Sequence, residues 1–454
     1  MTDLFNRLRS AVPGVLWPMA PDHAGASALA LQHQLDQSQW WSVAQLQQQQ
    51  LRQFQSVLRH ALETVPCWRE RLGNALQNPV DHFDWVRFRE LPLLTRADVQ
   101  QLGNHLLSRR IPPEHGRLVN SETSGSTGRP IKRYGSGLTE LFWRAFTLRE
   151  HLWHARDFSG RLAAIRLKVE RGETKGWGPA TDLVFDTGPC ALLNLRTDLD
   201  EQLDWLQAQA PQYLITNASN LLWLAQRSRE RGIRLPGLLQ ARSFGGALPD
   251  GTRAAVRAAW GVGLADVYTA EEVGYIALQC PHHEHYHVQS EGLIVEILDD
   301  DGRPCAPGRI GRVVVTTLHN FAMPLIRYEL GDFAEAGEAC ACGRGLPVIA
   351  RILGRERNIL RLPDGRRHWP SFPTDKWSRA VPVIRQLQIV QKSRVDMLLR
   401  IVAPRELSED EARTLIASLQ ACLGHPFRMT IERVDEIARS GNFKFEDFVS
   451  ECAD

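Results

Sequence analysis

Hydrophobic positions in the opening region recur with the spacing of an α-helix. They run through a glutamine-rich polar stretch, at Leu46, Leu51, Phe54, Leu58, Leu62 and Val65. A stripe at this period is typical of a helix with one face in the core. Pro66 follows directly, and proline lacks the amide hydrogen that a helix interior needs, so we expect the helix to end there. The sequence therefore predicts a helical lead-in over about residues 1–110.

The pattern changes between about residues 110 and 350. Short runs of β-branched residues alternate there with segments of helical spacing. Such alternation favours an α/β fold with a largely parallel sheet. The runs at 293–298 and 312–317 are the clearest predicted strands, and an acidic, glycine-ended turn at 299–302 follows the first of them.

A smaller unit is predicted at the end of the chain. After a charged, glycine-started stretch at 354–358, Pro363-Asp-Gly365 between two short apolar runs predicts a hairpin. Ser408 and Glu411 form a capping box before a helix that stops at Gly424, and alternating Phe427, Met429 and Ile431 predict a strand. We expect an α/β fold in which a large domain with mixed or parallel sheets (1–354) is joined by a hinge linker (355–358) to a small mobile α+β domain (359–454).

Composition narrows the classes of function. The 454 residues include 54 Lys and Arg against 52 Asp and Glu, giving a formal net charge of +2. The charges are interspersed, which argues against nucleic acid as a partner. No 18-residue apolar run occurs, and the apolar patch near the N-terminus is too short and proline-broken for a signal peptide. We therefore expect a cytoplasmic protein with no membrane partner.

Three of the eight cysteines stand near a group of histidines. Cys280 opens the run Cys-Pro-His-His-Glu-His-Tyr-His287, and Cys340-Ala-Cys342 follows further along the chain. Eight cysteines in a chain of this length do not indicate a disulfide framework. Three thiols and a choice of histidines suffice for a closed tetrahedral zinc site. Buried free thiols beside a solvated histidine-rich loop are the alternative.

The segment from Ser121 to Pro130 holds five hydroxyl residues and two glycines. Glycines let successive backbone N–H groups converge on a phosphate, and the hydroxyls supply further donors. The Walker pattern is absent, so a P-loop NTPase is excluded. A Ser/Gly-rich surface turn is the alternative to a phosphate-binding loop.

The segment 123–130 resembles the T-S-G-[ST]-T-G-x-P loop of the adenylate-forming superfamily of acyl-CoA synthetases. Four further segments match that superfamily in order, namely 243–249 (the wall of the adenine pocket), 266–274 (Y-G-x-[ST]-E-x-G), 322–332 (P-L-I-R-Y-x-x-G-D) and 440–450 (the terminal lysine motif). The third of these is similar to the branch of phenylacetate-CoA ligases, coenzyme F390 synthetases and capsule-biosynthesis homologues, which also carries a Cys/His zinc set.

The resemblance implies a role for each matched residue. ATP would be bound by the loop and the segments that follow it in family order, at Thr123, Ser124, Gly125, Ser126, Thr127, Gly128, Lys132, Gly245, Gly246, Ala247, Tyr268, Asp332 and Arg355. Glu272 would hold Mg²⁺ on the phosphates, and Lys444 and Thr127 would join it in catalysis. The family positions for zinc fall on Cys280, His287, Cys340 and Cys342.

Some positions depart from the family pattern. Thr269 stands where glycine is usual, Glu271 where Ser or Thr is common, Phe443 for glycine and Glu446 for arginine. The family hinge position falls on Arg357, where aspartate or lysine is more usual. Glu271 and Glu272 are also compatible with an acidic pair in water that holds no metal.

The resemblance implies a two-step reaction. ATP and an aromatic or other small organic acid would give an acyl-adenylate and pyrophosphate, and the thiol of coenzyme A would then take the acyl group. Transfer to an amine, a hydroxyl or a carrier-protein thiol is the second hypothesis, and a nucleotide-binding homologue without catalysis is the third. Trp177, Trp223 and Phe244 are candidates for the acyl pocket or for the core, and a homodimer is one arrangement to test.

Overall fold

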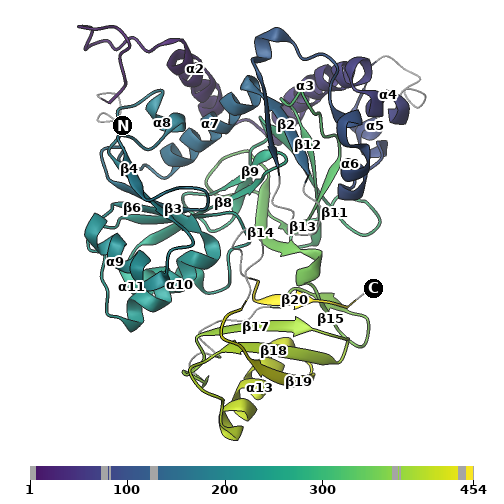
Figure 1. Ribbon diagram of the computed structural model, residues 1–454. Coiled ribbons are helices and arrows are strands. Elements are labelled where there is room, and N and C mark those ends of the chain that lie inside the picture. Colours follow the sequence, from purple (N-terminus) through teal and green to yellow (C-terminus); the bar gives the residue numbers. More distant parts are fainter. Residues whose placement is uncertain are drawn as a thin grey trace.

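The computed structural model describes residues 7–72, 80, 83–122, 131–370, 377, 380–437 and 446–452. Figure 1 shows a large part built on a long sheet, with a small domain beneath it that carries the C-terminal strands. The helices and 3₁₀ turns of the large part are α2 (His23–Ser38), α3 (Val43–Thr64), α4 (Pro66–Leu72), α5 (Trp85–Glu90), α6 (Arg96–Leu102), η2 (Gly103–Leu106), η3 (Pro113–His115), α7 (Gly137–Trp153), α8 (Pro179–Asp182), α9 (Leu199–Gln209), α10 (Ala218–Glu230) and α11 (Thr252–Trp260).

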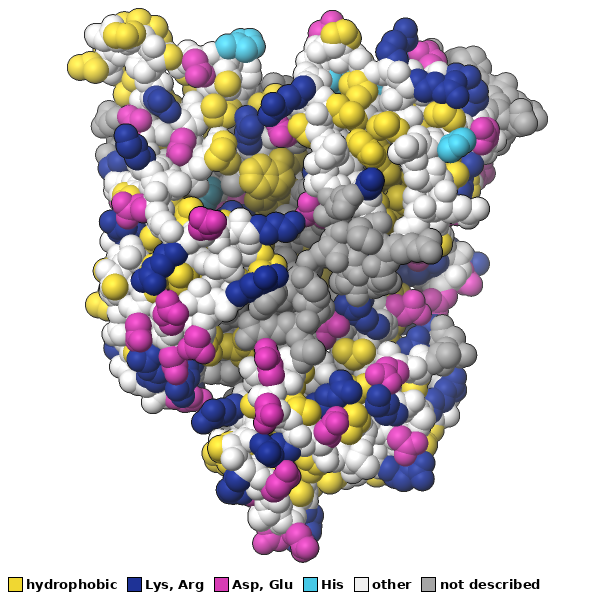
Figure 2. Space-filling view, in the orientation of Figure 1, with side chains coloured by type: hydrophobic (Ala, Val, Ile, Leu, Met, Phe, Trp, Pro, Cys, Tyr) yellow, Lys and Arg dark blue, Asp and Glu magenta, His cyan; other side chains and the backbone are white. Residues whose placement is uncertain are grey.

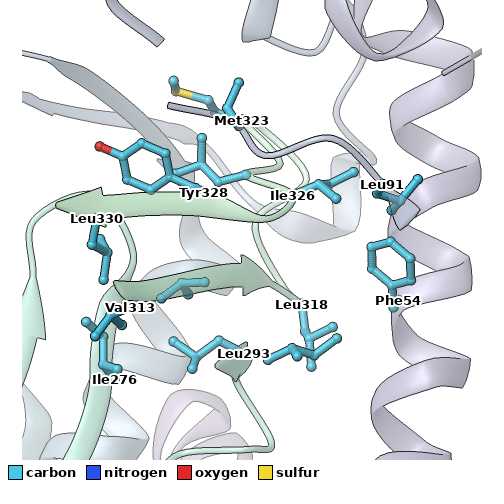
Figure 3. Packing of buried hydrophobic residues seen from close by; sticks show 14 of the residues in the cluster. Phe54, Leu91, Ile276, Leu293, Val313, Leu318, Met323, Ile326, Tyr328 and Leu330 are labelled. Atoms are coloured by element: carbon cyan, nitrogen blue, oxygen red, sulfur yellow. The ribbon is translucent and has the colours of Figure 1, made fainter. Parts of the chain in front are cut away.

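The predicted first helix is α3. Ser42 caps it with a capping box to Gln45, and Phe54 and Leu58 on its apolar face are fully buried. Pro66 then begins α4. Proline is tolerated at the first position of a helix, because the N–H there has no partner within the helix. In Figure 3 Phe54 projects from α3 toward the sheet, near Leu91, so this helix closes one side of the main core.

Twelve strands form the main sheet, in the order β11-β12-β13-β14-β10-β9-β8-β7-β6-β3-β5-β4. The strands are β3 (Leu162–Arg166), β4 (Gly172–Thr174), β5 (Cys190–Asn194), β6 (Tyr213–Asn217), β7 (Gln240–Phe244), β8 (Gly263–Ala270), β9 (Gly274–Gln279), β10 (Tyr286–Val288), β11 (Leu293–Leu298), β12 (Ile310–Thr317), β13 (Tyr328–Ala336) and β14 (Val348–Arg355).

The sheet is parallel over only part of its width. The pairs β5-β3, β3-β6, β6-β7 and β7-β8 are parallel, and α9, α10 and α11 lie against this part in Figure 1. From β8 to β14 the neighbours are antiparallel, because no helical crossover separates these strands in the sequence. The largely parallel sheet predicted for 110–350 is therefore restricted to its first half, and the expected strands at 293–298 and 312–317 are β11 and most of β12.

The C-terminal domain has a core of its own. Its sheet has the order β19-β18-β17-β20, and α13 packs on it through buried residues such as Leu415 and Leu419. Ser408 and Glu411 form the predicted capping box, and Gly424 ends the helix in the left-handed region. The elements are η4 (Glu356–Asn358), β15 (Leu360–Arg361), β16 (Arg367–His368), β17 (Gln386–Gln391), β18 (Asp396–Val402), α13 (Glu409–Leu423), β19 (Arg428–Arg433) and β20 (Phe448–Ser450).

The predicted fold class is confirmed, with a large mixed α/β sheet and a smaller C-terminal sheet domain. The predicted domain limits and the mobility of the small domain stay predictions. Within the residues that the structure describes, none of the helices has the length and hydropathy that crossing a membrane requires.

Candidate functional site

The expected phosphate loop connects two paired strands. Residues Thr123 to Pro130 lie outside the described residues, but β1 (Leu118–Glu122) and β2 (Lys132–Ser136) on either side of them pair antiparallel, with Glu122 opposite Lys132. Residues 123–130 are therefore the connection of a β-hairpin formed by β1 and β2. Neighbouring residues of a strand point to opposite faces, so Lys132 is exposed while Arg133 is turned into a pocket described below.

Glu272 lies at the tip of a short hairpin. Ala270 of β8 pairs with Gly274 of β9, which leaves residues 271–273 as the turn. Glu271 is exposed there, whereas Glu272 is buried and accepts a hydrogen bond from Nη1 of Arg96 on α6, at 2.9 Å. The two adjacent carboxylates thus have different surroundings, and among the residues that the structure describes a cation pairs with Glu272 but none with Glu271.

Tyr268, Asp332 and Arg355 form one connected group. Asp332 on β13 stands opposite Arg355 on β14, and the Arg355 Nε lies 2.9 Å from its Oδ1. Tyr268 on β8 donates to the other oxygen, Oδ2, at 2.9 Å. Burial opposes the charge of Arg355, but Asp332 and then Glu272 hold its pKa above its usual value. Burial, with Asp332 as the next cause, raises the pKa of Tyr268 well above its usual value, so the phenol stays a hydrogen-bond donor.

The expected adenine wall follows β7. Gly245 has φ +81°, a left-handed conformation that glycine adopts without strain, and Gly246 and Ala247 after it are exposed. The Cβ of Ala247 lies 3.8 Å from the place where a Cβ on Gly354 would stand. The wall segment is therefore close to the end of β14 that carries Arg355.

The matched motif at 322–332 also contains an arginine with a structural role. Arg327 is buried at φ +47° and forms an ion pair with Glu296, with its Nε 3.0 Å from the carboxylate. Its Nη1 donates to the backbone oxygens of Arg89 and Leu91. Arg327 thus ties β13 to β11 and to the segment after α5, and these bonds position Asp332 five residues on.

The predicted hinge is bonded to both parts of the protein. Arg355 pairs with Asp332 in the large part, whereas Arg357 forms an ion pair with Glu446 of the small domain, at 2.6 Å. The Asn358 side chain donates to the backbone oxygen of Phe448 at 2.8 Å. Lys444 lies outside the described residues, two positions before Glu446.

A pocket beside Glu272 contains residues that sequence reasoning missed. It encloses about 490 Å³ of empty space, part of which is open to solvent. Its lining comes from β2, α7, the β8–β9 hairpin and the segments around β11 and β12, namely Arg133, Thr139, Phe142, Trp143, Phe146, Glu272, Val273, Gly274, Tyr275, Gly292, Leu293, Thr317, His319 and Asn320.

The tryptophans and phenylalanine proposed for the acyl pocket do not line this one. Trp177 and Phe244 pack on small core clusters instead. The helical spacing of Phe142 and Phe146 on α7 was the available signal, but an aromatic stripe on a helix equally fits a core face. In the orientation of Figure 1, Figure 2 shows hydrophobic side chains in a hollow between the two upper parts of the molecule, with Lys and Arg side chains around it.

The cysteines and histidines expected to bind zinc come together. The ligand atoms of Cys280, His285, His287 and Cys340 all lie within 4.8 Å of one another. The Cys342 Sγ lies 3.4 Å from Nε2 of His287, and the Sγ atoms of Cys280 and Cys340 are 3.9 Å apart. Sulfur and imidazole donors at such distances suit a tetrahedral zinc ion. His285 is an addition to the set expected from the sequence.

Comparisons with known proteins agree on one group of enzymes. A phenylacetate-coenzyme A ligase of Thermus thermophilus is 30% identical over 329 residues, which cover 69% of this chain and 71% of that protein. One from Pseudomonas putida is 23% identical over 334 residues, 72% of this chain and 74% of that protein. No family model matches the chain.

A solved structure supports the fold over almost the full length. The crystal structure of a 2-hydroxyisobutyryl-CoA ligase in the postadenylation state, in complex with R3-HIB-AMP, superposes with a TM-score of 0.71 at 18% identity and covers 92% of each chain.

Proposed function

Because the chain belongs to the phenylacetate-coenzyme A ligase family, we propose that the group around Glu272, Asp332 and Arg355 is the place where it activates a carboxylic acid with ATP. The chain is an AMP-forming acid–CoA ligase, which forms an acyl-adenylate and passes the acyl group to coenzyme A. The observation that supports this location is the convergence of Tyr268, Asp332 and Arg355 near Glu272, which lines a pocket.

The nucleotide would be held by groups already fixed in place. Asp332 offers carboxylate oxygens that suit a vicinal diol such as the ribose, and it is only partly buried. Arg355 beside it would stabilise negative charge on the ribose-phosphate. The glycines after β7 leave room for a flat base against backbone, and the loop 123–130 would close over the phosphates.

Adenylation needs the acid and the α-phosphate, both anionic, to meet. Glu272 provides carboxylate oxygen, the donor type that Mg²⁺ prefers, and Mg²⁺ bound there would offset phosphate charge. Glu272 is fixed by Arg96, so its position does not depend on the ligand. Lys444 would add a second positive charge as the carboxylate attacks.

Thioester formation would follow a rotation of the small domain. Arg355 is bonded to the large part and Arg357 to the small domain, so backbone rotation between these two residues would keep both ion pairs. This supports the hinge at 355–358. The cytoplasmic location and the homodimer stay predictions.

Replacing Asp332 by alanine is expected to weaken ATP binding by about 1–3 kcal/mol, the cost of losing a charged hydrogen-bond partner. Isothermal titration with ATP measures this directly. Glu335→Ala is the matched control, because Glu335 has similar burial and pairs with an arginine, Arg351, in the same strand ladder, but that arginine is exposed. Equal ATP affinities for the two variants would move the ribose site elsewhere.

We propose further that Cys280, His287, Cys340 and Cys342 bind one structural zinc ion. The site would join the segment after β9 to the loop between β13 and β14. Glu272 lies just before β9, and Asp332 lies in β13, so the zinc site would connect the two segments that carry these residues. Loss of zinc should therefore lower stability first and activity second.

Metal analysis of protein purified without a histidine tag is expected to give about one zinc ion per chain. Cys340→Ser should lose the metal and lower the melting temperature, whereas Cys305→Ser, outside the cluster, should keep both. Cys342→Ser should lose zinc, and His285→Ala should retain it. The opposite result would show that His285, and not Cys342, is the fourth zinc ligand. Folded, active wild-type protein without metal would remove the site.

Pyrophosphate release with a library of carboxylic acids, with and without coenzyme A, tests the proposed function. We expect acid-dependent release and an acyl-CoA product. Release without thioester formation would favour an amine or carrier-protein acceptor, and no release with any acid would favour a homologue that only binds nucleotide.

A further inference from the structure

The pocket beside Glu272 has flat aromatic walls. Phe142, Trp143 and Phe146 come from successive turns of α7, and Tyr275 packs near Trp143 with ring centroids 6.1 Å apart. His319 stacks on Phe142 with centroids 3.8 Å apart and an angle of 9°. A Cβ on Gly292 would lie 2.7 Å from the Phe146 ring, so only glycine there leaves this wall in place. Such walls favour a planar ring over a branched aliphatic chain.

Most polar atoms of the lining are satisfied within the protein. The Tyr275 hydroxyl donates to Thr147, whose own hydrogen goes to the backbone oxygen of Trp143, and accepts from Arg242. The Asn320 amide donates to the backbone oxygen of Tyr134. The Thr139 hydroxyl donates to the backbone oxygen of Ser136. These groups shape the pocket but have little left to offer a ligand.

Arg133 is different. Among the described residues it forms no hydrogen bond or ion pair, and its Nε is buried without a partner. Burial lowers its pKa, although the carboxylates of Glu271, Glu140 and Glu272 act against this. These carboxylates make no direct hydrogen bond or ion pair with Arg133, so a half-buried guanidinium is left that an anion in the pocket could bind. Arg133 stands at the end of the pocket near the Glu271–Glu272 hairpin, where the reacting carboxylate of the acid has to lie.

His319 offers the pocket a hydrogen-bond acceptor, whereas Arg133 offers donors. Its Nε2 lies 2.9 Å from the backbone oxygen of Glu291, and because a carbonyl only accepts, Nε2 carries the hydrogen. Burial lowers the pKa of His319 to about 4, so the ring is neutral near pH 7. Nδ1 is then an acceptor; it has no partner among the residues that the structure describes, and it remains accessible to solvent.

We propose that the acid substrate is an aromatic carboxylic acid with a hydroxyl or amino group on its ring. Arg133 binds the carboxylate, the aromatic walls hold the ring, and His319 Nδ1 accepts a hydrogen bond from the ring substituent. An unsubstituted ring would cover Nδ1 without giving it a hydrogen-bond partner. This inference rests on the proposed function and names the substrate class of the same site.

The test compares acids that differ only in the ring substituent. Acyl-CoA formation by the full chain is measured with benzoate and phenylacetate and with their hydroxy and amino isomers. At least one substituted isomer is expected to exceed its parent in kcat/KM by about 10- to 100-fold. In His319→Phe, which keeps the ring stack without an acceptor, this ratio should fall to about 1. His319→Asn, whose Oδ1 can replace Nδ1, should retain part of the preference even if the Phe variant folds poorly.

Arg133 is tested by a second readout. Arg133→Gln should raise KM about 10- to 100-fold for every acid while KM for ATP stays close to wild type. Arg144→Gln on α7, a surface arginine paired with Glu140, is the control and should change neither value.

The outcomes separate this inference from the proposed function. Parent acids used as well as all their substituted isomers, or a preference that survives in His319→Phe, would overturn the substrate class while leaving the ligase activity intact. Pyrophosphate release with none of the acids would overturn the proposed function and the inference with it.

Discussion

Replacing Lys444 by alanine is expected to lower the rate of adenylation by about 10²–10³-fold, the scale for removing one preorganised charge at a transition state. The ammonium would neutralise charge that develops as the carboxylate attacks, so ATP affinity should stay nearly unchanged. Glu446, two residues on, forms an ion pair with Arg357 at the predicted hinge.

Pyrophosphate release in a single turnover measures this prediction, together with ATP binding by titration. Lys392→Ala is the control, because Lys392 belongs to the same domain and pairs with Glu451 at the surface. Adenylation at the wild-type rate in Lys444→Ala would overturn the assignment of the terminal motif.

Changing Glu272 to glutamine is expected to lower adenylation by a similar factor, about 10²–10³-fold, and to raise the Mg²⁺ concentration needed for half-maximal rate. The amide oxygen can still accept the hydrogen bond from Arg96, so the hairpin should keep its shape. The substitution therefore separates a role toward the metal from a purely structural ion pair.

Glu271→Gln provides the matched control for this variant. Glu271 is the adjacent, exposed carboxylate of the same turn, and its loss should leave the rate and the Mg²⁺ dependence near wild type. If both variants behave alike, the pair is an acidic turn in water, which was the alternative left open by the sequence.

Local features of the sequence predicted local structure well. The stripe through Phe54 and Leu58, the capping box of Ser408 and Glu411, and the hairpin around Pro363 to Gly365 all form as expected. Each depends on residues a few positions apart, for which spacing and backbone preference carry most of the information. The ordered motifs likewise singled out Tyr268, Asp332 and Arg355, which the structure brings into one hydrogen-bonded group, while their roles toward ATP stay predictions.

Apart from the cysteine–histidine cluster, contacts between distant segments could not be predicted from the sequence. The bond from Tyr268 to Asp332 spans 64 residues, and the one from Asn320 to Tyr134, which brings the strand of Arg133 beside His319, spans 186. Nothing in the local pattern marks Arg133 or His319 as residues of one pocket. The sequence identified the whole motif at 322–332. It did not show that Arg327 within the motif has a structural role, which follows from its bonds to Glu296, Arg89 and Leu91.

The central claim is that this chain activates a carboxylic acid by adenylation and passes the acyl group to coenzyme A. Quantifying all products of one reaction with ATP, an accepted acid and coenzyme A tests it most directly. We expect equal amounts of AMP, pyrophosphate and acyl-CoA, with no ADP. Formation of ADP and phosphate, or ATP cleavage that does not depend on the acid, would contradict it.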